Sequence, residues 1–281
     1  MVKLIHRDKL RIIHNKMLKT NFSCLRLGYM PSFNINLMSE IKFAKKHFDF
    51  IEITLKYNLK EYSGKYLGKI KQNLGNFEIL GHIHWEINLT RKESLEKIYK
   101  NIEIYKFLGA KKVTIHPSAS PDMNRKQIRI KNLKALKIIL NLCKKNKIQL
   151  LIENTARPPF NSAKEFKFLF TKNPSLLTTL DIGHANSVSK KELDDYLNNF
   201  STKIAHIHLH YNYGKVDHLL FPEKEKEWLN YILKRLSKLG SELTVSLEMF
   251  AVLNKQKPIL IDGKQRRNLL LRQLKFIENL E

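Results

Sequence analysis

Eight short apolar runs, separated by longer segments, constrain the fold of this sequence more than any other feature. Each run is a few residues long, is often rich in β-branched residues and is bounded by polar residues, which is typical of buried parallel strands. The runs are Cys24–Tyr29, Phe50–Thr54, Phe77–Ile83, Lys112–His116, Ile148–Ile152, Leu177–Asp181, Lys203–Leu209 and Glu242–Glu248. The sequence therefore predicts eight buried strands.

Segments with helical periodicity lie between these runs. The clearest are Ser94–Leu108, Gln127–Cys143, Trp228–Leu239 and Arg266–Ile277. Strands that alternate with helices over 281 residues predict a single α/β domain, a closed (β/α)8 TIM barrel. An open doubly wound sheet is the alternative. It would more often carry a Gly-rich phosphate loop after its first strand, and the segment 28–31, Gly-Tyr-Met-Pro, is not such a loop.

The segment before the first strand predicts a short basic helical extension, residues 1–22, attached to a barrel formed by residues 23–281. The extension lacks the apolar stretch and cleavage site of a signal peptide, and no apolar run approaches the roughly 20 residues that cross a bilayer. We therefore expect a cytoplasmic monomer that has no membrane partner. Two cysteines, Cys24 and Cys143, provide neither a disulfide framework nor a thiolate zinc site.

Imidazole and carboxylate side chains cluster at the ends of six consecutive predicted strands, from the third to the eighth. They are His82, His84, His116, Glu153, Asp181, His184, His206, His208, His210, Asp217, His218 and Glu248. The active sites of (β/α)8 enzymes lie at the carboxyl ends of the strands. At least three carboxylates that converge there would repel one another, and burial of an unpaired charge costs several kcal/mol. A divalent cation resolves the conflict, and these ligands suit Zn²⁺ or Mn²⁺, with Fe²⁺ as a further option.

The seventh strand carries three histidines on one face, because side chains alternate along a strand. They cannot all lie at the same height. We expect His208 to be the ligand, His206 to pack inside the barrel and His210 to lie just beyond the site. The neighbouring residues Asp217 and His218 diverge in an extended chain, so joint ligation of one ion requires a turn.

The formal net charge of +25 indicates attraction to polyanions such as nucleic acid. A Lys-, Asn- and Ile-rich composition also arises from an A·T-rich genome without selection for binding. Candidate DNA-binding residues are Lys56, Tyr57 and Lys60, which interleave charge and aromaticity, and Trp85. The alternative is that Trp85 packs under a helix and that the Lys/Tyr alternation forms an amphipathic helix face.

These strand-end motifs resemble the xylose-isomerase-like barrels that include endonuclease IV, the second family of abasic-site endonucleases. The segments 82–89 and 116–117 are similar to its third- and fourth-strand signatures, and residues 153–156, Glu-Asn-Thr-Ala, to its bridging glutamate segment. The resemblance implies a three-metal cluster in which Glu153 bridges two ions, and the number of ligand side chains predicts two to three divalent ions per chain, with Zn²⁺ as the expected metal. Its implied ligands are His82, His116, Glu153, Asp181, His184, His208, Asp217, His218 and Glu248. It also implies that Trp85 lies against DNA near the lesion.

The sugar isomerases and epimerases of the same superfamily are similar as well. That resemblance implies one metal ion, held by Glu153, Asp181, His208 and Glu248, with the two glutamates as an acid/base pair. Glu52 resembles a second-strand residue of those enzymes, although a carboxylate at the barrel rim is the alternative.

We therefore expect a metal-dependent phosphodiester hydrolase that incises DNA at abasic sites, in which Glu153 or Glu248 orients the attacking water. The alternative is a sugar or sugar-phosphate isomerase or epimerase that uses Glu153 and Glu248 as its acid/base pair. A non-catalytic nucleic-acid-binding barrel is a third reading, which the set of ligands disfavours.

Overall fold

The computed structural model describes residues 22, 24–32, 36–214, 216–240, 243–254, 257–261 and 263–280. Eight parallel strands close into a barrel in the order β1-β10-β7-β6-β5-β4-β3-β2. They are β1 Arg26–Tyr29, β2 Phe50–Thr54, β3 Glu78–His82, β4 Lys112–Ile115, β5 Gln149–Glu153, β6 Leu177–Asp181, β7 Ile204–Leu209 and β10 Thr244–Leu247. The predicted (β/α)8 barrel is confirmed, and each of the eight barrel strands overlaps a predicted run. The predicted extension lies outside the described residues except for Phe22, whose side chain is buried.

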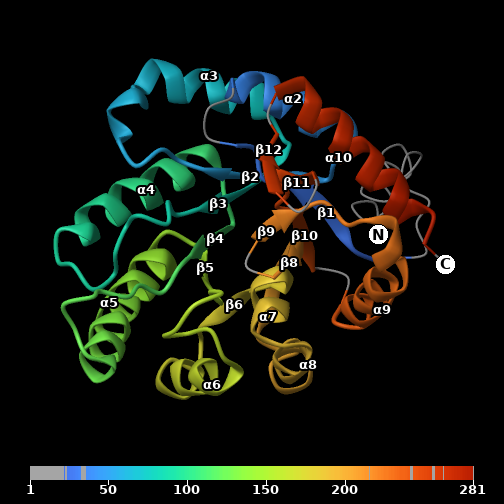
Figure 1. The fold of residues 1–281 in the computed structure, drawn as a ribbon. Helices are drawn as coiled ribbons and strands as arrows, with labels where there is room; N and C mark the ends of the chain where they lie inside the picture. Colours follow the sequence, from blue (N-terminus) through green and yellow to red (C-terminus); the bar gives the residue numbers. More distant parts are fainter. Residues whose placement is uncertain are drawn as a thin grey trace, which may run out of the picture.

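Helices form an outer ring around the strands (Figure 1). They are α2 Leu37–His47, α3 Gly64–Leu74, α4 Ser94–Leu108, α5 Arg125–Lys145, α6 Ala163–Lys172, α7 Ile182–Val188, α8 Lys190–Asn199, α9 Lys226–Ser237 and α10 Gly263–Glu278, with 3-10 turns η1 Leu59–Glu61 and η2 Glu223–Glu225. Local sequence sets their ends. A capping box between Asn124 and Gln127 starts α5, and Gly109, with a φ of 94°, ends α4. No helix in the described ranges is long and apolar enough to span a bilayer.

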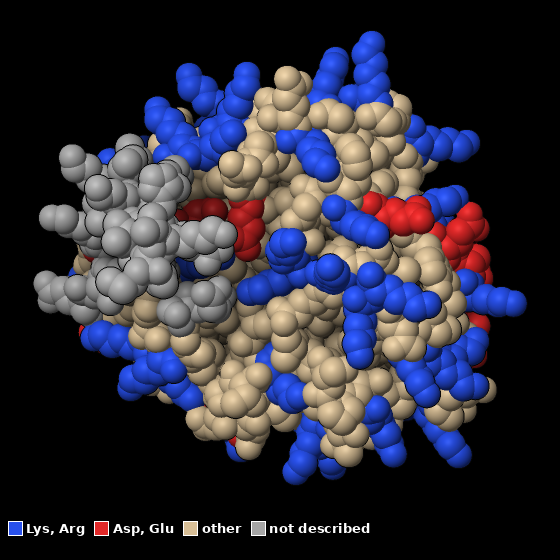
Figure 2. All heavy atoms as spheres, turned by 180° about the vertical axis from the view of Figure 1, so that it is seen from behind, with Lys and Arg blue, Asp and Glu red and all other residues tan. Residues whose placement is uncertain are grey.

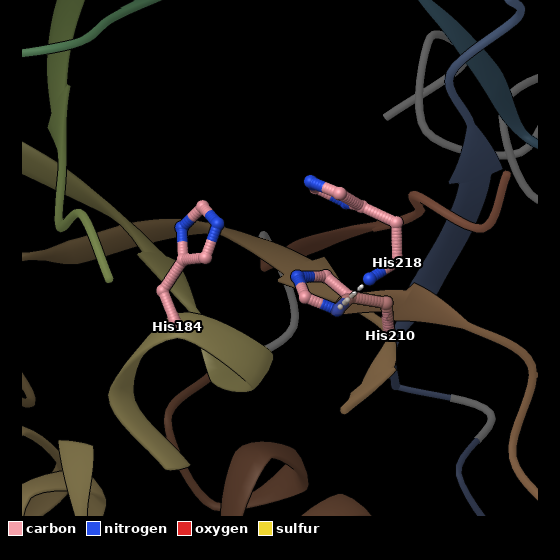
Figure 3. A group of neighbouring side chains, drawn as sticks. All are labelled: His184, His210 and His218. Carbon is pink, nitrogen blue, oxygen red and sulfur yellow. Dashed lines mark hydrogen bonds between the residues drawn. The ribbon is translucent and has the colours of Figure 1, made fainter. Parts of the chain in front are cut away.

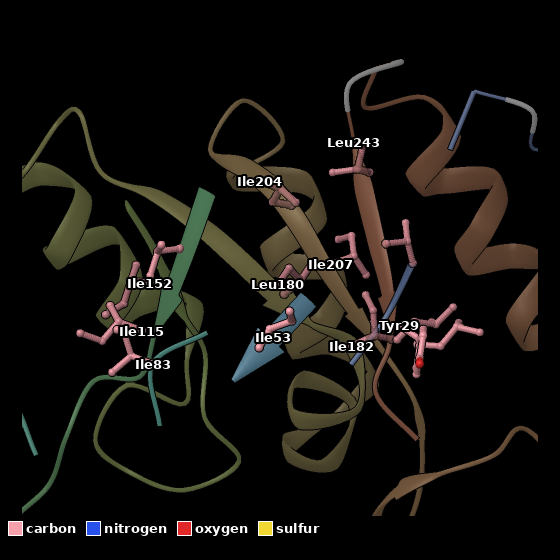
Figure 4. Packing of buried hydrophobic residues seen from close by; sticks show 14 of the residues in the cluster. Tyr29, Ile53, Ile83, Ile115, Ile152, Leu180, Ile182, Ile204, Ile207 and Leu243 are labelled. Carbon is pink, nitrogen blue, oxygen red and sulfur yellow. The ribbon is translucent and has the colours of Figure 1, made fainter. Parts of the chain in front are cut away.

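Alternation along the strands separates an apolar layer from a polar one. The main hydrophobic cluster lies between strands and helices, and its strand residues include Ile53, Ile115, Ile152, Leu180 and Ile207 (Figure 4). The intervening residues point into the barrel, where many of them are polar. The hydroxyl oxygens of Thr114 and Thr179, for example, lie 2.7 Å apart although their strands are not neighbours. The barrel interior can therefore carry a line of polar groups beneath its carboxyl end.

A small second sheet follows the carboxyl ends of β7 and β10. Its strands are β8 Tyr211–Tyr213, β9 Val216–Leu219, β11 Ala251–Asn254 and β12 Lys257–Leu260, in the order β12-β11-β9-β8. The sequence pattern predicts no strands here, because the segments are short and lack an apolar run. The sheet places the segment from β8 to β9 beside the ends of β6 and β7.

Candidate metal centre

Four acidic and imidazole side chains converge at the carboxyl ends of β5, β6, β7 and β10. Glu153, Asp181, His208 and Glu248 each offer a ligand atom within 4.8 Å of the others. All four are buried, at 8% exposure or less. Strand register causes this convergence, since β6 pairs Asp181 with His208 and β10 pairs Ser246, two residues before Glu248, with the same histidine. We call these four residues the central group.

His208 lies between two sets of carboxylates. Its Nδ1 is 2.9 Å from Glu248 Oε2 and 3.3 Å from Glu153 Oε1, while its Nε2 is 3.1 Å from Glu52 Oε1. Burial by itself lowers the pKa of His208, but Glu153, Glu52 and Glu248 together raise it well above the usual value. The ring therefore presents Nδ1 to the central group and is held from behind by Glu52.

Glu52 lies inside the barrel and is fully buried, which excludes the barrel-rim alternative. Its Oε2 accepts a 2.5 Å hydrogen bond from the Ser246 hydroxyl and is 2.9 Å from His206 Nε2. Burial raises the pKa of Glu52, but His208 and His206 outweigh it and hold that pKa well below the usual value. His206 Nδ1 in turn lies 2.7 Å from the Thr244 hydroxyl, so the histidine packs in the interior, as predicted.

A second group consists of His82, His116 and Glu153, whose ligand atoms also lie within 4.8 Å of one another. The Nε2 atoms of His82 and His116 are 3.1 Å and 3.2 Å from Glu153 Oε2. Glu153 thus belongs to both groups, with Oε2 toward these histidines and Oε1 toward His208. The hydroxyl of Tyr105 fixes the backbone at His82, to whose carbonyl it donates a hydrogen bond of 2.6 Å.

The third group lies around α7 and the small sheet, where His184, His210 and His218 offer ligand atoms within 4.8 Å of one another (Figure 3). Asp217 Oδ2 is 3.8 Å from His184 Nε2, and Asp217 Oδ1 is 3.9 Å from His218 Nε2. The turn required by the neighbouring Asp217 and His218 is present, because His218 has a φ of 54°. His210, expected just beyond the site, instead lies within it beside Asp181.

Several buried nitrogen and oxygen atoms in these groups could serve as ligands of a bound cation. The Nδ1 atoms of His82, His116 and His208, and Glu248 Oε2, have no hydrogen-bond partner among the described residues. Of these, His208 Nδ1 and Glu248 Oε2 belong to the central group and lie 2.9 Å apart as an ion pair. Burial raises the pKa of Glu153, but His116 and His208 hold it well below the usual value, so the carboxylate is ionised. An anionic oxygen and imidazole set of this kind suits Zn²⁺ or Mn²⁺.

A cavity of about 630 Å³ opens onto the site. Its lining combines potential ligands, among them His82, His116, His184, Asp217, His218 and Glu248, with the apolar side chains of Met30, Trp85 and Phe250. Trp85 is 53% exposed and stacks on His84 at a ring distance of 4.1 Å. The alternative that Trp85 packs under a helix is therefore wrong. Its indole faces the cavity.

The other candidate DNA-binding residues lie at the end of β2. Lys56 forms a 2.5 Å ion pair with Glu61, and Lys60 is in the η1 turn. Lys97 stands 3.3 Å above the ring of Tyr57. The segment is a loop and a 3-10 turn before α3, so its alternation is not a single amphipathic helix face. Lysine and arginine spread across the face seen in Figure 2 and do not gather in one patch.

Comparison with known proteins places this geometry in a family. The sequence profile of xylose isomerase-like TIM barrels matches residues 41–279. An uncharacterized protein of Methanocaldococcus jannaschii is 30% identical over 160 residues, which are 56% of this chain and 62% of that protein. The alignment thus spans less than two thirds of that relative. A second uncharacterized protein of the same organism is 26% identical over 253 residues, 83% of this chain and 84% of the relative.

Similar solved structures share the barrel at low sequence identity. A D-tagatose 3-epimerase-like protein has a TM-score of 0.68 at 21% identity, covering 90% of this chain and 98% of that one. D-psicose 3-epimerase, solved in the presence of D-fructose, has a TM-score of 0.69 at 15% identity, covering 90% and 100%. A Thermus thermophilus protein soaked with ZnCl₂ has a TM-score of 0.63 at 16% identity, covering 90% and 97%. These likenesses show the fold, and the profile match shows that the chain belongs to the xylose isomerase-like TIM barrel family.

Proposed function

We propose that the chain is a divalent-metal-dependent sugar isomerase or epimerase. The observation that carries the proposal is the central group, in which two carboxylates, Glu153 and Glu248, each offer an oxygen within 4.8 Å of the other at the base of a partly apolar cavity. Similar solved structures include sugar 3-epimerases, which supports this function over the endonuclease expected from the sequence.

The size and lining of the cavity favour a small polyol. A pocket of about 630 Å³ lies within the range of small-molecule sites. Met30 and Phe250 can contact the apolar face of a sugar, and the exposed indole of Trp85 supplies a flat surface at the entrance. His184 and Asp217 offer polar atoms that can bind hydroxyl groups.

The two glutamates have the arrangement that proton exchange at carbon requires. A bound divalent cation would polarise the carbonyl and adjacent hydroxyl oxygens of an open-chain sugar. One carboxylate then removes the proton from the carbon beside the carbonyl and, now protonated, can return it to the neighbouring carbon in an isomerisation. In an epimerisation the opposite carboxylate must first take up a proton from solvent and then deliver it to the other face of the same carbon. Both glutamates are ionised, because neighbouring histidines outweigh burial and lower their pKa values, so either can act as the base.

The experiment is solvent deuterium exchange in a panel of ketoses and ketose phosphates. The full chain, loaded with Mn²⁺ or Zn²⁺, is incubated with each sugar in D₂O, and proton NMR follows loss of the signal at the carbon beside the carbonyl. We expect exchange with at least one sugar, and loss of exchange in Glu153→Gln and Glu248→Gln. A metal-loaded protein that exchanges no proton with any member of the panel contradicts the proposal.

A second candidate is a multi-metal phosphodiester hydrolase acting on abasic DNA. It is favoured by the His82, His116 and Glu153 group, whose buried Nδ1 atoms have no hydrogen-bond partner among the described residues and which a one-metal isomerase does not need. The net charge of +25 also favours a polyanionic substrate. Clustered cations suit phosphate ester cleavage, because they can activate water and neutralise the leaving oxygen.

Metal content and nicking activity distinguish the two candidates. Elemental analysis of natively purified protein should give about one ion per chain for the isomerase, and two to three for the hydrolase. Incision of a duplex with one abasic site, compared with an undamaged duplex, is measured on the same sample. Two or more ions together with specific incision would establish the hydrolase.

A further inference from the structure

His210 occupies a position between the central group and the small sheet. It follows β7 by one residue, and its side chain is fully buried. Its ring lies 5.5 Å from that of His184 and 4.4 Å from that of His218, measured between centroids (Figure 3). Proximity alone would make His210 a third imidazole ligand of one ion, but its own hydrogen bonds indicate otherwise.

The Nε2 atom of His210 contacts the carboxylate of Asp181. It lies 3.0 Å from Oδ2 and 3.0 Å from Oδ1. An ionised carboxylate only accepts hydrogen bonds, so Nε2 must carry the proton and donate. Asp181 Oδ1 also accepts a 2.6 Å hydrogen bond from the backbone N–H of His184. Two donors on different elements therefore fix the orientation of this carboxylate.

The Nδ1 atom of His210 is engaged as well. It accepts a 2.9 Å hydrogen bond from the backbone N–H of His218, and the carbonyl of Tyr211 lies 3.2 Å away. A proton on Nδ1 would point at the backbone N–H of His218, whose position is fixed. An unprotonated Nδ1 instead accepts a hydrogen bond from that N–H. Both ring nitrogens of His210 are then occupied by protein partners. Neither has a lone pair left for a metal ion.

The surrounding backbone is built around this ring. A Cβ at Gly183 would overlap the His210 imidazole, so the first turn of α7 accommodates the ring only with glycine there. His218 presents its N–H from the left-handed region, at a φ of 54°, which is uncommon for a residue other than glycine. Two independent backbone features thus accommodate the position of His210.

We propose that His210 is a positioning residue, which aims the carboxylate of Asp181 into the central group and ties it to the segment that carries Asp217 and His218. The proposal rests on the proposed metal site. Outer partners of this kind orient metal-binding side chains, and their loss typically lowers metal affinity 10–100-fold. The His210 ring contacts both Asp181 and the segment from β8 to β9. The conformation of that segment is therefore linked to the orientation of Asp181 in the central group.

Metal titration of matched variants tests the proposal. The full chain is stripped with a chelator and titrated calorimetrically with Mn²⁺, and Co²⁺ absorption spectra report ligand geometry. His210→Gln keeps an N–H donor near Asp181, whereas His210→Asn keeps an acceptor for the His218 N–H but cannot reach Asp181. We expect His210→Asn to bind Mn²⁺ about 10–100-fold more weakly at unchanged stoichiometry, and His210→Gln to recover most of the loss.

Two further variants keep the test independent of folding defects. Gly183→Ala retains the imidazole but displaces it, and should weaken Mn²⁺ binding in the same direction. Asn199→Ala is the control, because it removes a 2.7 Å hydrogen bond to the carbonyl of Asp195 within α8, away from every candidate ligand, and should bind as the parent does. Circular dichroism confirms the fold of each variant.

Two results would overturn the proposal. Loss of one equivalent of metal in both His210 variants, with the remaining affinity unchanged, would make His210 a ligand. An affinity in His210→Asn equal to that of the parent would remove its positioning role. Neither result depends on sugar turnover, so the inference about His210 can stand if the proposed isomerase activity fails, and the reverse also holds.

Discussion

Glu52 and His208 face each other across the barrel interior, with a carboxylate oxygen 3.1 Å from the imidazole Nε2 and both side chains fully buried. The contact leaves Nδ1 of His208 directed at Glu153 and Glu248. A carboxylate behind a metal-binding imidazole fixes its tautomer and strengthens its basicity. We therefore expect Glu52 to orient His208 toward a cation bound by the central group.

Replacing Glu52 by Gln should weaken metal binding. The amide cannot supply the negative charge that both histidines and Ser246 share, so Mn²⁺ affinity should fall about 10–100-fold. Calorimetric titration of the stripped protein provides the measurement. Glu61→Gln, which removes the exposed partner of Lys56, is the matched control and should bind normally. Equal affinities in the two variants would show that Glu52 is only a packing element.

Glu153 should be more costly to lose than Glu248, because it alone belongs to both the central group and the His82–His116 group. Glu153→Ala should reduce metal content and lower turnover about 10²–10⁴-fold while the fold is retained. Elemental analysis, deuterium exchange and circular dichroism test these effects together. Near-normal turnover would contradict the site assignment, whereas full metal retention with lost turnover would indicate a purely acid/base role.

Metal binding should release protons at neutral pH. Although burial lowers the pKa values of His116 and His208, nearby carboxylates raise them above the usual 6.5 in the metal-free protein. A cation must displace these protons, so its apparent affinity should increase as the pH rises through the raised pKa values and level off above them. Titrations in buffers of different ionisation enthalpy measure the proton count. Binding without proton release between pH 6 and 7 would contradict this expectation.

Tyr105→Phe should destabilise the protein. The buried hydroxyl lies 2.8 Å from the carbonyl of Ile53 and 2.6 Å from that of His82, and so joins the ends of β2 and β3. Its removal should cost about 1–3 kcal/mol in the free energy of unfolding, because buried acceptors lose their donor. Urea denaturation measures this cost, and Tyr99→Phe on the exposed side of the same helix should change little.

Trp85→Ala should leave stability nearly unchanged and weaken substrate binding. The indole is 53% exposed, and substitutions at such sites usually change stability by about 0.5 kcal/mol or less. Phe166, which is fully buried, is the contrast, and its truncation to Ala should cost about 3–5 kcal/mol. The KM of the active sugar, or the binding constant for abasic DNA, provides the functional measurement. A large loss of stability in Trp85→Ala would assign the indole a structural role.

Local sequence was sufficient for the barrel and for the strand ends. Strands such as β2 and β6 coincide with their predicted runs. A parallel strand that is buried on both faces has a short, continuous apolar sequence, and this pattern can be recognised without knowing which strands lie beside it. Parallel strands then bring Glu153, Asp181 and Glu248 to one end of the barrel, whatever the details of the loops. The polar character of that end, and hence the prediction of a metal centre, follows from the sequence alone.

Only the tertiary structure decided the positions that depend on backbone conformation or on pairing across the barrel. Asp217 lies near both His184 and His218, although Asp217 and His218 are neighbours in the sequence. This is possible because the positive φ of His218 interrupts the alternation of side chains along an extended strand. His210 enters the site because Gly183 leaves room for its ring, and Glu52 reaches His208 from a strand that is not adjacent to β7. Such contacts join residues far apart in the chain, so no local pattern of apolar and polar residues can encode them.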